Sequence, residues 1–360
     1  MVVGAPRVPS GDFRGVPSAI GHLSLGFGLS RDYSRTHLQM IAVEEHAASG
    51  EDPPGARRQR EVTGMGVPGD LDILMVGHFA KDRLVVDGQV ETASGGAVYY
   101  GGMALRRLGV RVGIATRMHP DDFPRLEELR AAGAELFVTS SQATSGIENI
   151  YASADMERRT CRLLGFAGPF RIEDIPNVRA GVCLIIPVIA GEVDLHLLKA
   201  MAARGPVGMD VQGFVRVPEG DQLVYRHWPD MREGLACISY LKADKAEAEL
   251  LTGETDLARA ARALAEYGPR EIVLTQASGV TVYAGGQIYT ASFTSRSLRG
   301  RTGRGDTCFA TYVGRRLTAS AEEACRWAGA VTTLKQESPG PWCGTLAEVE
   351  ALLRSRGRCA

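Results

Sequence analysis

The residues best suited to chemistry lie in one glycine-rich stretch, Gly300-Arg301-Thr302-Gly303-Arg304-Gly305-Asp306, directly before a segment of helical character. Small residues let backbone N–H groups approach an anion closely, and the first turn of a helix adds free donors and a favourable dipole. Asp306 stands at that helix start, where the dipole keeps its carboxylate ionised and able to take a proton from a hydroxyl. The stretch therefore predicts an anion cradle at Gly303, Arg304 and Gly305 beside a general base, which is what phosphoryl transfer to an alcohol needs.

A second cluster of oxygen ligands lies at the start of a helix predicted over 245–251. Asp244 and Glu247 are three residues apart and so face the same way in the first helical turn. Paired carboxylates at this spacing can hold a hydrated Mg²⁺ beside phosphates. The same two residues would also serve as a charged first turn that complements the helix dipole, and the spacing alone leaves both interpretations open.

Two further sites follow the first predicted strand, which covers 71–77. Asp82 comes five residues after Gly77, at the carboxyl edge of a sheet, where a carboxylate can bind neighbouring hydroxyls of a polyol. Gly95 and Gly96 precede a helix predicted over 98–108 and can expose backbone N–H groups to a ligand oxygen. A surface-loop Asp and an ordinary glycine turn are the alternatives at these positions.

The elements that must position these residues alternate along the chain. Short apolar runs predict strands at 71–77, 110–115, 182–188, 207–211, 235–241 and 271–275, with helical segments between or after them. This alternation favours a mostly parallel sheet covered by helices on both faces. The more polar segments 146–151 and 158–164 read as hairpins, which would suit a small β flap added to that sheet.

Composition limits the class of protein. The chain has 360 residues, 44% of them hydrophobic, and a net charge of −1, so it carries no basic footprint for nucleic acid and no apolar run long enough to span a membrane. Its seven cysteines are scattered and form no Cys-x-x-Cys pair, which favours a reduced cytoplasmic protein without structural zinc. Residues 1–66 are rich in Gly and Pro and are expected to form a disordered extension, or to reflect a start codon assigned too early, with Met65 just before the fold begins.

Taken together, the motifs resemble those of the PfkB, or ribokinase-like, carbohydrate kinases. The stretch 95–109 is similar to the first family signature, and 300–306 is similar to the second, usually written Asp-Thr-x-Gly-Ala-Gly-Asp. Residues 241–253 resemble the family segment Lys-Pro-Asn-x-x-Glu-x-Glu-x-Leu-Thr-Gly, with Asp244 in place of Asn. Residues 272–280 resemble the strand and turn beneath the nucleotide phosphates, and 326–341 resemble the helix and loop that flank adenine.

The resemblance implies a fold and a reaction. It implies a three-layer α/β/α sandwich over 67–356 with a mostly parallel central sheet, and a small β lid formed by about 83–92 and 146–164. The reaction would be ATP- and Mg²⁺-dependent phosphorylation of a hydroxyl on a sugar or small polyol. The residues that match the family motifs would have these roles: Asp306 as base; Gly303, Arg304 and Gly305 as anion hole; Asp82, Gly95, Gly96 and Tyr100 at the substrate; Thr275, Gly279 and Gly340 at the nucleotide; Asp244 and Glu247 at the metal.

Departures from the family pattern leave several points open. Tyr100 replaces the usual Asn on the substrate side, so a nucleoside or inositol acceptor is an alternative to a simple sugar. Gly300 and Arg301 stand where the family often has Asp and Thr. In potassium-using relatives that Asp and the residue two after it help to hold the ion, so activation by a monovalent cation is doubtful here. Arg304 replaces Ala inside the cradle; we expect it to clamp phosphate rather than point to solvent.

Other classes of protein fit less well. The intact Asp306 argues against a catalytically silent sugar-binding regulator, although this alternative stays open. A Gly-x-Gly-x-x-Gly after the first strand and a Gly-Lys-Ser/Thr motif are both missing, which excludes a dinucleotide-binding oxidoreductase and a Walker-type NTPase. We therefore expect a small-molecule acceptor, no nucleic-acid partner and no membrane, with the protein a monomer or a homodimer paired through the lid.

Overall fold

A computed structural model describes residues 71–86, 88–151 and 159–357 of the chain. The expected N-terminal extension 1–66 lies outside these residues, as does the segment 152–158 of the expected lid. The strands of the main sheet are β1 (Leu71–Val76), β4 (Val112–Met118), β5 (Glu135–Ser140), β8 (Ala180–Ile185), β9 (Val207–Asp210), β12 (Tyr240–Asp244), β13 (Glu271–Gln276), β14 (Gly279–Ala284) and β15 (Gln287–Ser292).

Within the described residues this sheet has nine strands in the order β15-β14-β13-β12-β9-β8-β1-β4-β5. All neighbours from β13 to β5 pair in parallel, whereas β14 and β15 are added as antiparallel strands at one edge. Parallel strands need crossover connections, and the helices that cross over necessarily lie on the faces of the sheet.

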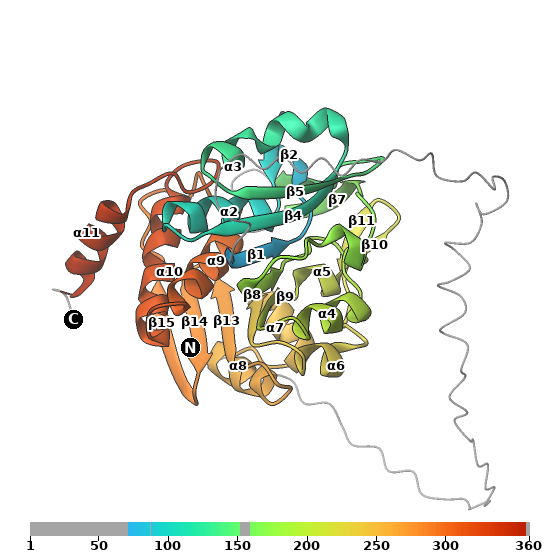
Figure 1. Cartoon of the computed structure of the whole chain (residues 1–360). Coiled ribbons are helices and arrows are strands. Elements are labelled where there is room, and N and C mark those ends of the chain that lie inside the picture. Colours follow the sequence, from blue (N-terminus) through green and yellow to red (C-terminus); the bar gives the residue numbers. More distant parts are fainter. Residues whose placement is uncertain (1–70, 87, 152–158, 358–360) are drawn as a thin grey trace, which may run out of the picture. The chain divides into compact units, whose positions relative to one another are not determined.

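Helices cover both faces (Figure 1). They are α2 (Ala97–Arg107), α3 (Glu127–Ala131), α4 (Leu195–Ala202), α5 (Gln212–Val215), α6 (Met231–Leu235), α7 (Lys245–Thr252), α8 (Leu257–Ala265), α9 (Arg304–Arg316) and α10 (Ala321–Gln336). The last helix, α11 (Leu346–Gly357), packs on α10. Successive residues of β1 belong to different cores: Ile73 and Met75 pack with α2, α3, α9 and α10, whereas Leu74 and Val76 pack with α4, α6, α7 and α8. The expected three-layer α/β/α architecture with a mostly parallel sheet is thereby confirmed.

A second sheet is added to the first. Its strands are β2 (Ala80–Val86), β3 (Gln89–Gly95), β6 (Gly146–Tyr151), β7 (Arg159–Gly165), β10 (Arg216–Glu219) and β11 (Gln222–Tyr225). Within the described residues these six strands have the order β10-β11-β7-β6-β2-β3. Four of them contain the segments expected to form the lid, whereas the hairpin β10–β11 was not expected, because its residues carry little apolar alternation.

One predicted strand is wrong in position. The run 235–241 was expected to be extended, but Leu235 ends helix α6 and the strand begins only at Tyr240. Leu235 and Ile238 are both buried in the core on the α6 side of the sheet. A short buried apolar run satisfies a helix end as well as a strand, so the pattern alone does not separate them.

Helix α2 packs closely against the first turns of α9. A Cβ on Gly101 of α2 would lie 3.0 Å from the Cβ of Ala310 and 3.5 Å from the carbonyl oxygen of Asp306, both in α9. Glycine at this position lets the backbone of α2 come close to the first turns of α9. The helix that follows the expected substrate residues Gly95 and Gly96 and the helix that carries the expected base are therefore in direct contact.

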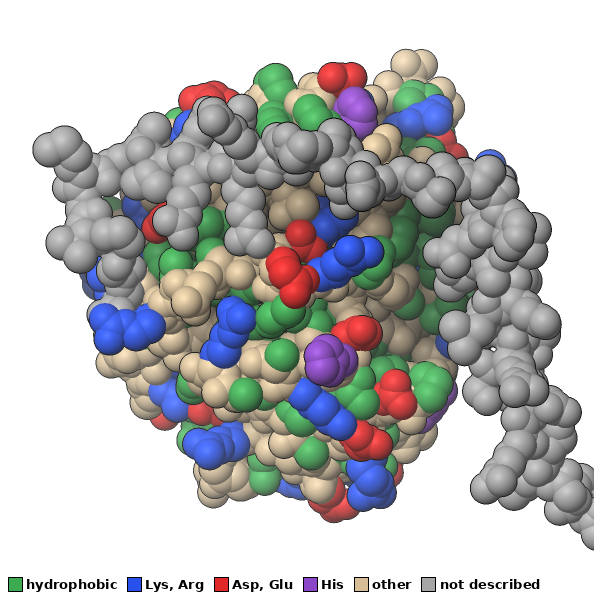
Figure 2. Space-filling view, turned by 45° about the vertical axis from the view of Figure 1, so that its right-hand side comes forward, with side chains coloured by type: hydrophobic (Ala, Val, Ile, Leu, Met, Phe, Trp, Pro, Cys, Tyr) green, Lys and Arg blue, Asp and Glu red, His purple; other side chains and the backbone are tan. Residues whose placement is uncertain are grey.

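Two negative findings bear on partners. None of the helices in residues 71–86, 88–151 and 159–357 is long and apolar enough to cross a membrane. On the face of the molecule shown in Figure 2, Lys and Arg side chains are interspersed with Asp and Glu rather than gathered in one basic patch.

Candidate active site

The expected catalytic turn lies at the N-terminus of α9. Gly303 is the residue before the helix and has a φ of 79°, the left-handed region that favours glycine. The Arg304 N–H, expected in the anion hole, donates to the carbonyl of Arg301 at 3.2 Å. Helix geometry leaves the N–H groups of Gly305 and Asp306 without intrahelical acceptors, so these two are the better anion donors.

The ring of Tyr100 packs against this turn at Gly303. The ring is 4% exposed and stands so close to Gly303 that an added Cβ there would lie 2.2 Å from the ring Cγ. Its hydroxyl reaches the carbonyl of Ser94 at 3.4 Å, beside Gly95. These contacts favour a supporting position beneath the cradle, and the expected contact of Tyr100 with the substrate stays a prediction.

A buried ion pair lies on the other side of the turn. The Nζ of Lys242, in β12, contacts both carboxylate oxygens of Asp210, at the end of β9, at 3.1 and 2.9 Å. Burial lowers the pKa of Lys242, but the charges of Asp210 and Glu247 outweigh it and raise that pKa above its usual range. A Cβ on Gly305 would lie 3.5 Å from this Nζ, so a fixed ammonium adjoins the cradle.

The electrostatics of Asp306 suit a base. The side chain is half-buried, and burial raises the pKa of its carboxyl. The charge of Lys242 opposes this shift, and so do those of Arg216 and Lys335, whereas Asp210 adds to it. A raised pKa makes the carboxylate a better proton acceptor than an ordinary Asp, and the three nearby positive charges favour its ionised form.

Asp244 and Glu247 lie at the start of α7, where the sequence left a charged first turn as one alternative, and they form a reciprocal cap there. The Asp244 side chain accepts the Glu247 N–H at 2.9 Å, and the Glu247 side chain accepts the Asp244 N–H at 2.7 Å. The remaining Glu247 oxygen, Oε1, is buried and has no hydrogen-bond partner within the described residues. Burial raises the pKa of Glu247 to about 7, against the opposing charge of Lys242.

Asp244 and Glu247 can therefore supply only part of the ligands of a cation. The buried, unpartnered Oε1 is the kind of oxygen that a metal would satisfy. The described residues contain no group of three or more His, Cys, Asp or Glu side chains that could hold a metal by themselves. Such a set suits Mg²⁺, which keeps several waters and shares its remaining positions with substrate phosphates.

Asp82, Gly95 and Gly96 form a compact cluster at the start of α2. Asp82 is buried, and one of its oxygens accepts the Ile147 N–H at 2.9 Å. A Cβ on Gly95 would lie 2.3 Å from the other oxygen, so only glycine leaves that oxygen its place. Gly96 precedes α2 with a φ of 87°. The cluster joins the second sheet to the helix that packs on the catalytic turn.

The three expected nucleotide residues differ in their placement. Thr275 is buried at the end of β13, and its Oγ1 would lie 3.7 Å from a Cβ on Gly305, so it adjoins the cradle. A Cβ on Gly279 would lie 2.5 Å from the Ala291 carbonyl, a close approach between β14 and β15 that by itself requires glycine. Gly340 has a φ of 78° and no atom within 4 Å of a Cβ position. A nucleotide contact of all three stays a prediction.

Several residues of this site were not expected from the sequence. Lys242 and Asp210 were missed, although a charged residue within or at the end of a buried strand is a usable signal. Arg216 was missed too: it is 5% exposed, it contacts Gln212 at 3.0 Å, and its charge lowers the pKa of Asp306. Lys335 is a fourth such residue, and a lysine inside a helix gives no comparable signal.

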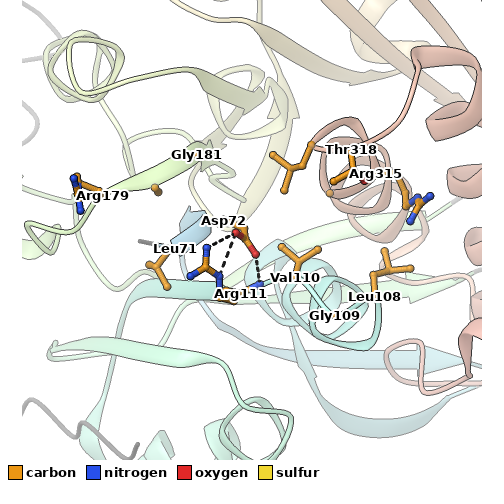
Figure 3. A pocket seen from close by; sticks show the side chains of 13 residues that line it. Leu71, Asp72, Leu108, Gly109, Val110, Arg111, Arg179, Gly181, Arg315 and Thr318 are labelled. Atoms are coloured by element: carbon orange, nitrogen blue, oxygen red, sulfur yellow. Dashed lines mark hydrogen bonds and ion pairs between the residues drawn. The ribbon is translucent and has the colours of Figure 1, made fainter. Parts of the chain in front are cut away.

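A pocket of about 600 Å³ lies elsewhere, at the amino ends of the strands β1 and β8 (Figure 3). It is lined by the first residues of β1 and β8 and by the end of α9, and its Asp72 is paired with Arg111 at 2.7 Å. Ligands of open α/β sheets bind beyond the carboxyl ends of the strands. The candidate site is therefore the cluster around the catalytic turn and not this pocket.

Solved structures with the same arrangement of elements identify the family. A pyrophosphate-dependent kinase in the ribokinase family, solved as a sulfate complex, is 39% identical, with a TM-score of 0.73. The alignment covers 78% of this chain and 99% of that one. The chain belongs to the ribokinase family. The same kind of kinase, complexed with a pyrophosphate analogue and myo-inositol, is 38% identical, with a TM-score of 0.72 over 78% of this chain and 99% of that one.

Other comparisons agree on the class. A cytidine kinase from Thermococcus kodakarensis is 28% identical over an alignment of 230 residues, and the match covers 60% of this chain and 77% of that protein. An Arabidopsis thaliana ribokinase complexed with ribose and ATP is 19% identical, with a TM-score of 0.63 over 79% of this chain and 99% of that one, a likeness of fold. No family model matches the chain. This ribokinase-family protein is a kinase, a phosphotransferase with an alcohol group as acceptor, as the motifs indicated.

Proposed function

We propose that this protein transfers a phosphoryl group to a hydroxyl of a cyclic polyol of the myo-inositol class. The observation that carries the proposal is the likeness to pyrophosphate-dependent kinases over almost their whole length, at 38% identity to one complexed with myo-inositol. Asp82 supports it, because a buried carboxylate with one oxygen beside Gly95 can accept hydrogen bonds from neighbouring hydroxyls.

Asp306 acts as the base in this proposal. Its carboxylate accepts the proton of the acceptor hydroxyl while that oxygen attacks the terminal phosphorus of the donor in line. The N–H groups of Gly305 and Asp306 stabilise the charge that develops on the transferred group. The charges of Lys242 and Arg216 favour the ionised form of Asp306, because both oppose the rise in its pKa that burial causes.

Mg²⁺ is the metal that the residues fit. Glu247, through its unpartnered Oε1, and Asp244 would hold it, directly or through water, beside the donor phosphates. When bound, the ion would neutralise phosphate charge and orient the donor. The two carboxylates would keep their capping role at the start of α7 as well.

Pyrophosphate is the phosphoryl donor that we propose. A donor without adenine and ribose has to be recognised by its charge, which favours a cradle rich in cations. Lys242 and Lys335 are buried beside the turn, and Arg301 and Arg304 are part of it. The Arg304 guanidinium lies 6.0 Å from the centre of the Phe293 ring, which supports it at the edge of the cradle.

ATP, the donor that the sequence motifs indicate, is the second candidate. Thr275 beside Gly305 favours it, since the matching strand and turn lie beneath nucleotide phosphates in the family that the sequence resembles. A nucleoside acceptor is the corresponding alternative to a polyol, in line with the likeness to a cytidine kinase. If the protein is instead a catalytically silent sugar-binding regulator, it should bind an acceptor without turnover.

Product formation separates these alternatives. The purified protein is incubated with Mg²⁺ and either pyrophosphate or ATP, and with myo-inositol, ribose or cytidine, and products are followed by phosphorus NMR. We expect turnover with pyrophosphate and myo-inositol, and a loss of about 10²–10⁴-fold in Asp306→Asn, the usual contribution of a general base. If only ATP supports turnover, pyrophosphate is not the donor. If only cytidine is phosphorylated, the acceptor is not a polyol of the myo-inositol class. If Asp306→Asn keeps full activity, Asp306 is not the base.

The role of Arg304 has a matched control. Arg304→Ala is expected to lower kcat with pyrophosphate several-fold or more, because it removes a cation from the cradle. Arg299→Ala removes the same charge from the exposed part of the same loop and is expected to keep the wild-type rate. Equal rates in both variants would remove Arg304 from the donor site.

Location and assembly follow from other observations. We infer a reducing, cytoplasmic setting, which six unbridged cysteines among the described residues support.

Pairing of two copies through the second sheet is favoured by three exposed apolar side chains on its strands: Val90, Leu164 and Tyr225. Gel filtration of the wild type and of Leu164→Ser tests this pairing, and a monomer in both cases would contradict it.

A further inference from the structure

A buried lysine holds the segment that leads into the catalytic turn. Lys335, near the end of α10, is 2% exposed, and its Nζ donates to the carbonyl oxygens of Gly300 and Thr302. Both acceptors are backbone carbonyls rather than carboxylates, so the ammonium stands where two peptide dipoles converge. Backbone carbonyls that converge in this way form the kind of site that binds a bare monovalent cation.

The segment is fitted closely to the end of α10. The Gly300 N–H donates to the Gln336 carbonyl at 2.8 Å, and a Cβ on Gly300 would lie 1.8 Å from the Ser338 carbonyl oxygen. The Lys335 Nζ also lies 4.9 Å from the centre of the Tyr100 ring, the ring that supports Gly303. Lysine, ring and turn thus form one packed unit directly behind the donors of the cradle.

A charge in this position is costly to bury, so its presence needs a reason. Burial lowers the pKa of Lys335, the charge of Asp306 raises it and that of Arg304 lowers it, and together they bring it to about 8. Desolvation of an ammonium is repaid only by well-placed acceptors. A leucine or methionine would fill the same volume without this penalty, so packing alone does not account for the lysine.

We propose that Lys335 is a positioning residue whose ammonium serves as a built-in monovalent cation, fixing the carbonyls of Gly300 and Thr302 so that the N–H groups of Gly305 and Asp306 face the donor. With the ammonium in this place the protein needs no K⁺ for activity. The sequence, through Gly300 and Arg301, only made activation by a monovalent cation doubtful and did not point to a replacement. The role assigned to the turn rests on the proposed function, whereas the cation-like site between the two carbonyls does not.

Two variants of different size test the proposal. Lys335→Ala leaves space between the carbonyls for a cation, whereas Lys335→Met fills that space with an apolar chain. Thermal unfolding and kcat are measured in KCl, NH₄Cl and choline chloride at equal ionic strength. In choline we expect both variants to lose about 10²-fold in kcat, the order seen when one transition-state donor is lost.

Cation dependence is the decisive readout. KCl or NH₄Cl should raise the unfolding temperature and kcat of Lys335→Ala above their values in choline, and should leave the wild type and Lys335→Met unchanged. A merely structural lysine would give no such selectivity. Recovery of folding in KCl by a Lys335→Ala protein that is unfolded in choline also supports the proposal, and failure in both salts counts against it.

Three results would overturn the proposal: a wild type strongly activated by K⁺, a fully active Lys335→Met, or a Lys335→Ala protein indifferent to the cation. A wild type without turnover on any donor and acceptor pair would defeat the proposed function instead. In that case the unfolding temperatures still decide whether a cation replaces the lysine, because they do not depend on catalysis.

Discussion

Replacing Gly303 by alanine tests the claim that the catalytic turn is held by its surroundings. Gly303 has a φ of 79°, and an added Cβ would lie 2.2 Å from Cγ, 2.3 Å from Cδ1 and 2.5 Å from Cδ2 of Tyr100. The ring cannot withdraw easily, because it is 4% exposed and lies against the Lys335 ammonium. Backbone strain and a steric clash therefore coincide at one residue.

The magnitude follows from these two contributions. A left-handed backbone costs a residue with a Cβ about 1–2 kcal/mol, and overpacking a filled core site costs about 1–3 kcal/mol. If the turn keeps its shape, the free energy of unfolding should fall by about 2–5 kcal/mol, the sum of these two ranges. If the turn yields instead, the N–H groups of Gly305 and Asp306 move away from the donor, and loss of one such group costs about 10²–10³ in kcat.

A matched variant separates the two contributions. Gly253 has a φ of 75° and no atom within 4 Å of its Cβ position, so Gly253→Ala carries the backbone strain without the clash. Urea unfolding and kcat are measured for both proteins. Gly253→Ala should lose stability and keep the wild-type kcat, whereas Gly303→Ala should lose more stability or kcat. Equal stability and equal kcat in the two variants would refute the reasoning that Tyr100 fixes the turn.

The remaining predictions concern substrate, metal and pH. Asp82→Asn keeps an acceptor for the Ile147 N–H but loses its charge, so the acceptor KM should rise about 10–100-fold, the equivalent of a hydrogen bond to a charged group, with the donor KM unchanged; an unaltered acceptor KM contradicts this. Glu247→Gln should raise the Mg²⁺ concentration for half-maximal rate about tenfold or more, whereas Glu249→Gln, exposed on the same helix, should not. Burial raises the pKa of Asp306, so kcat/KM should fall toward acid through an apparent pKa above the ~3.9 of an ordinary Asp, because only the ionised base is active. A pH profile that stays flat down to that value argues against Asp306.

Much of the fold was predictable from local patterns. Apolar runs and helical spacing gave the alternation of strands and helices, and so the parallel sheet with helices on both faces. The hairpin β10–β11 was not predictable, because its short, half-buried strands are stabilised by pairing with β7 and not by a pattern of their own. The strand at Tyr240 was misplaced because Leu235 and Ile238 are buried in the same core as the strands.

Within the site, the sequence determined what is local. The glycine turn, Asp306 at the helix start, the glycines before α2 and the acidic start of α7 depend on neighbours within a few residues, and the structure has these elements where the sequence predicts them.

Only the tertiary structure decided what surrounds the turn. It pairs Lys242 with Asp210, 32 residues away, packs the Tyr100 ring under Gly303, and sets the Lys335 ammonium on the carbonyls of Gly300 and Thr302. No periodicity encodes such contacts, since each depends on which faces of distant elements the folding chain buries together. The sequence thus predicts Asp306 as the base, whereas the tertiary packing sets its pKa, through burial first and through the nearby charges second.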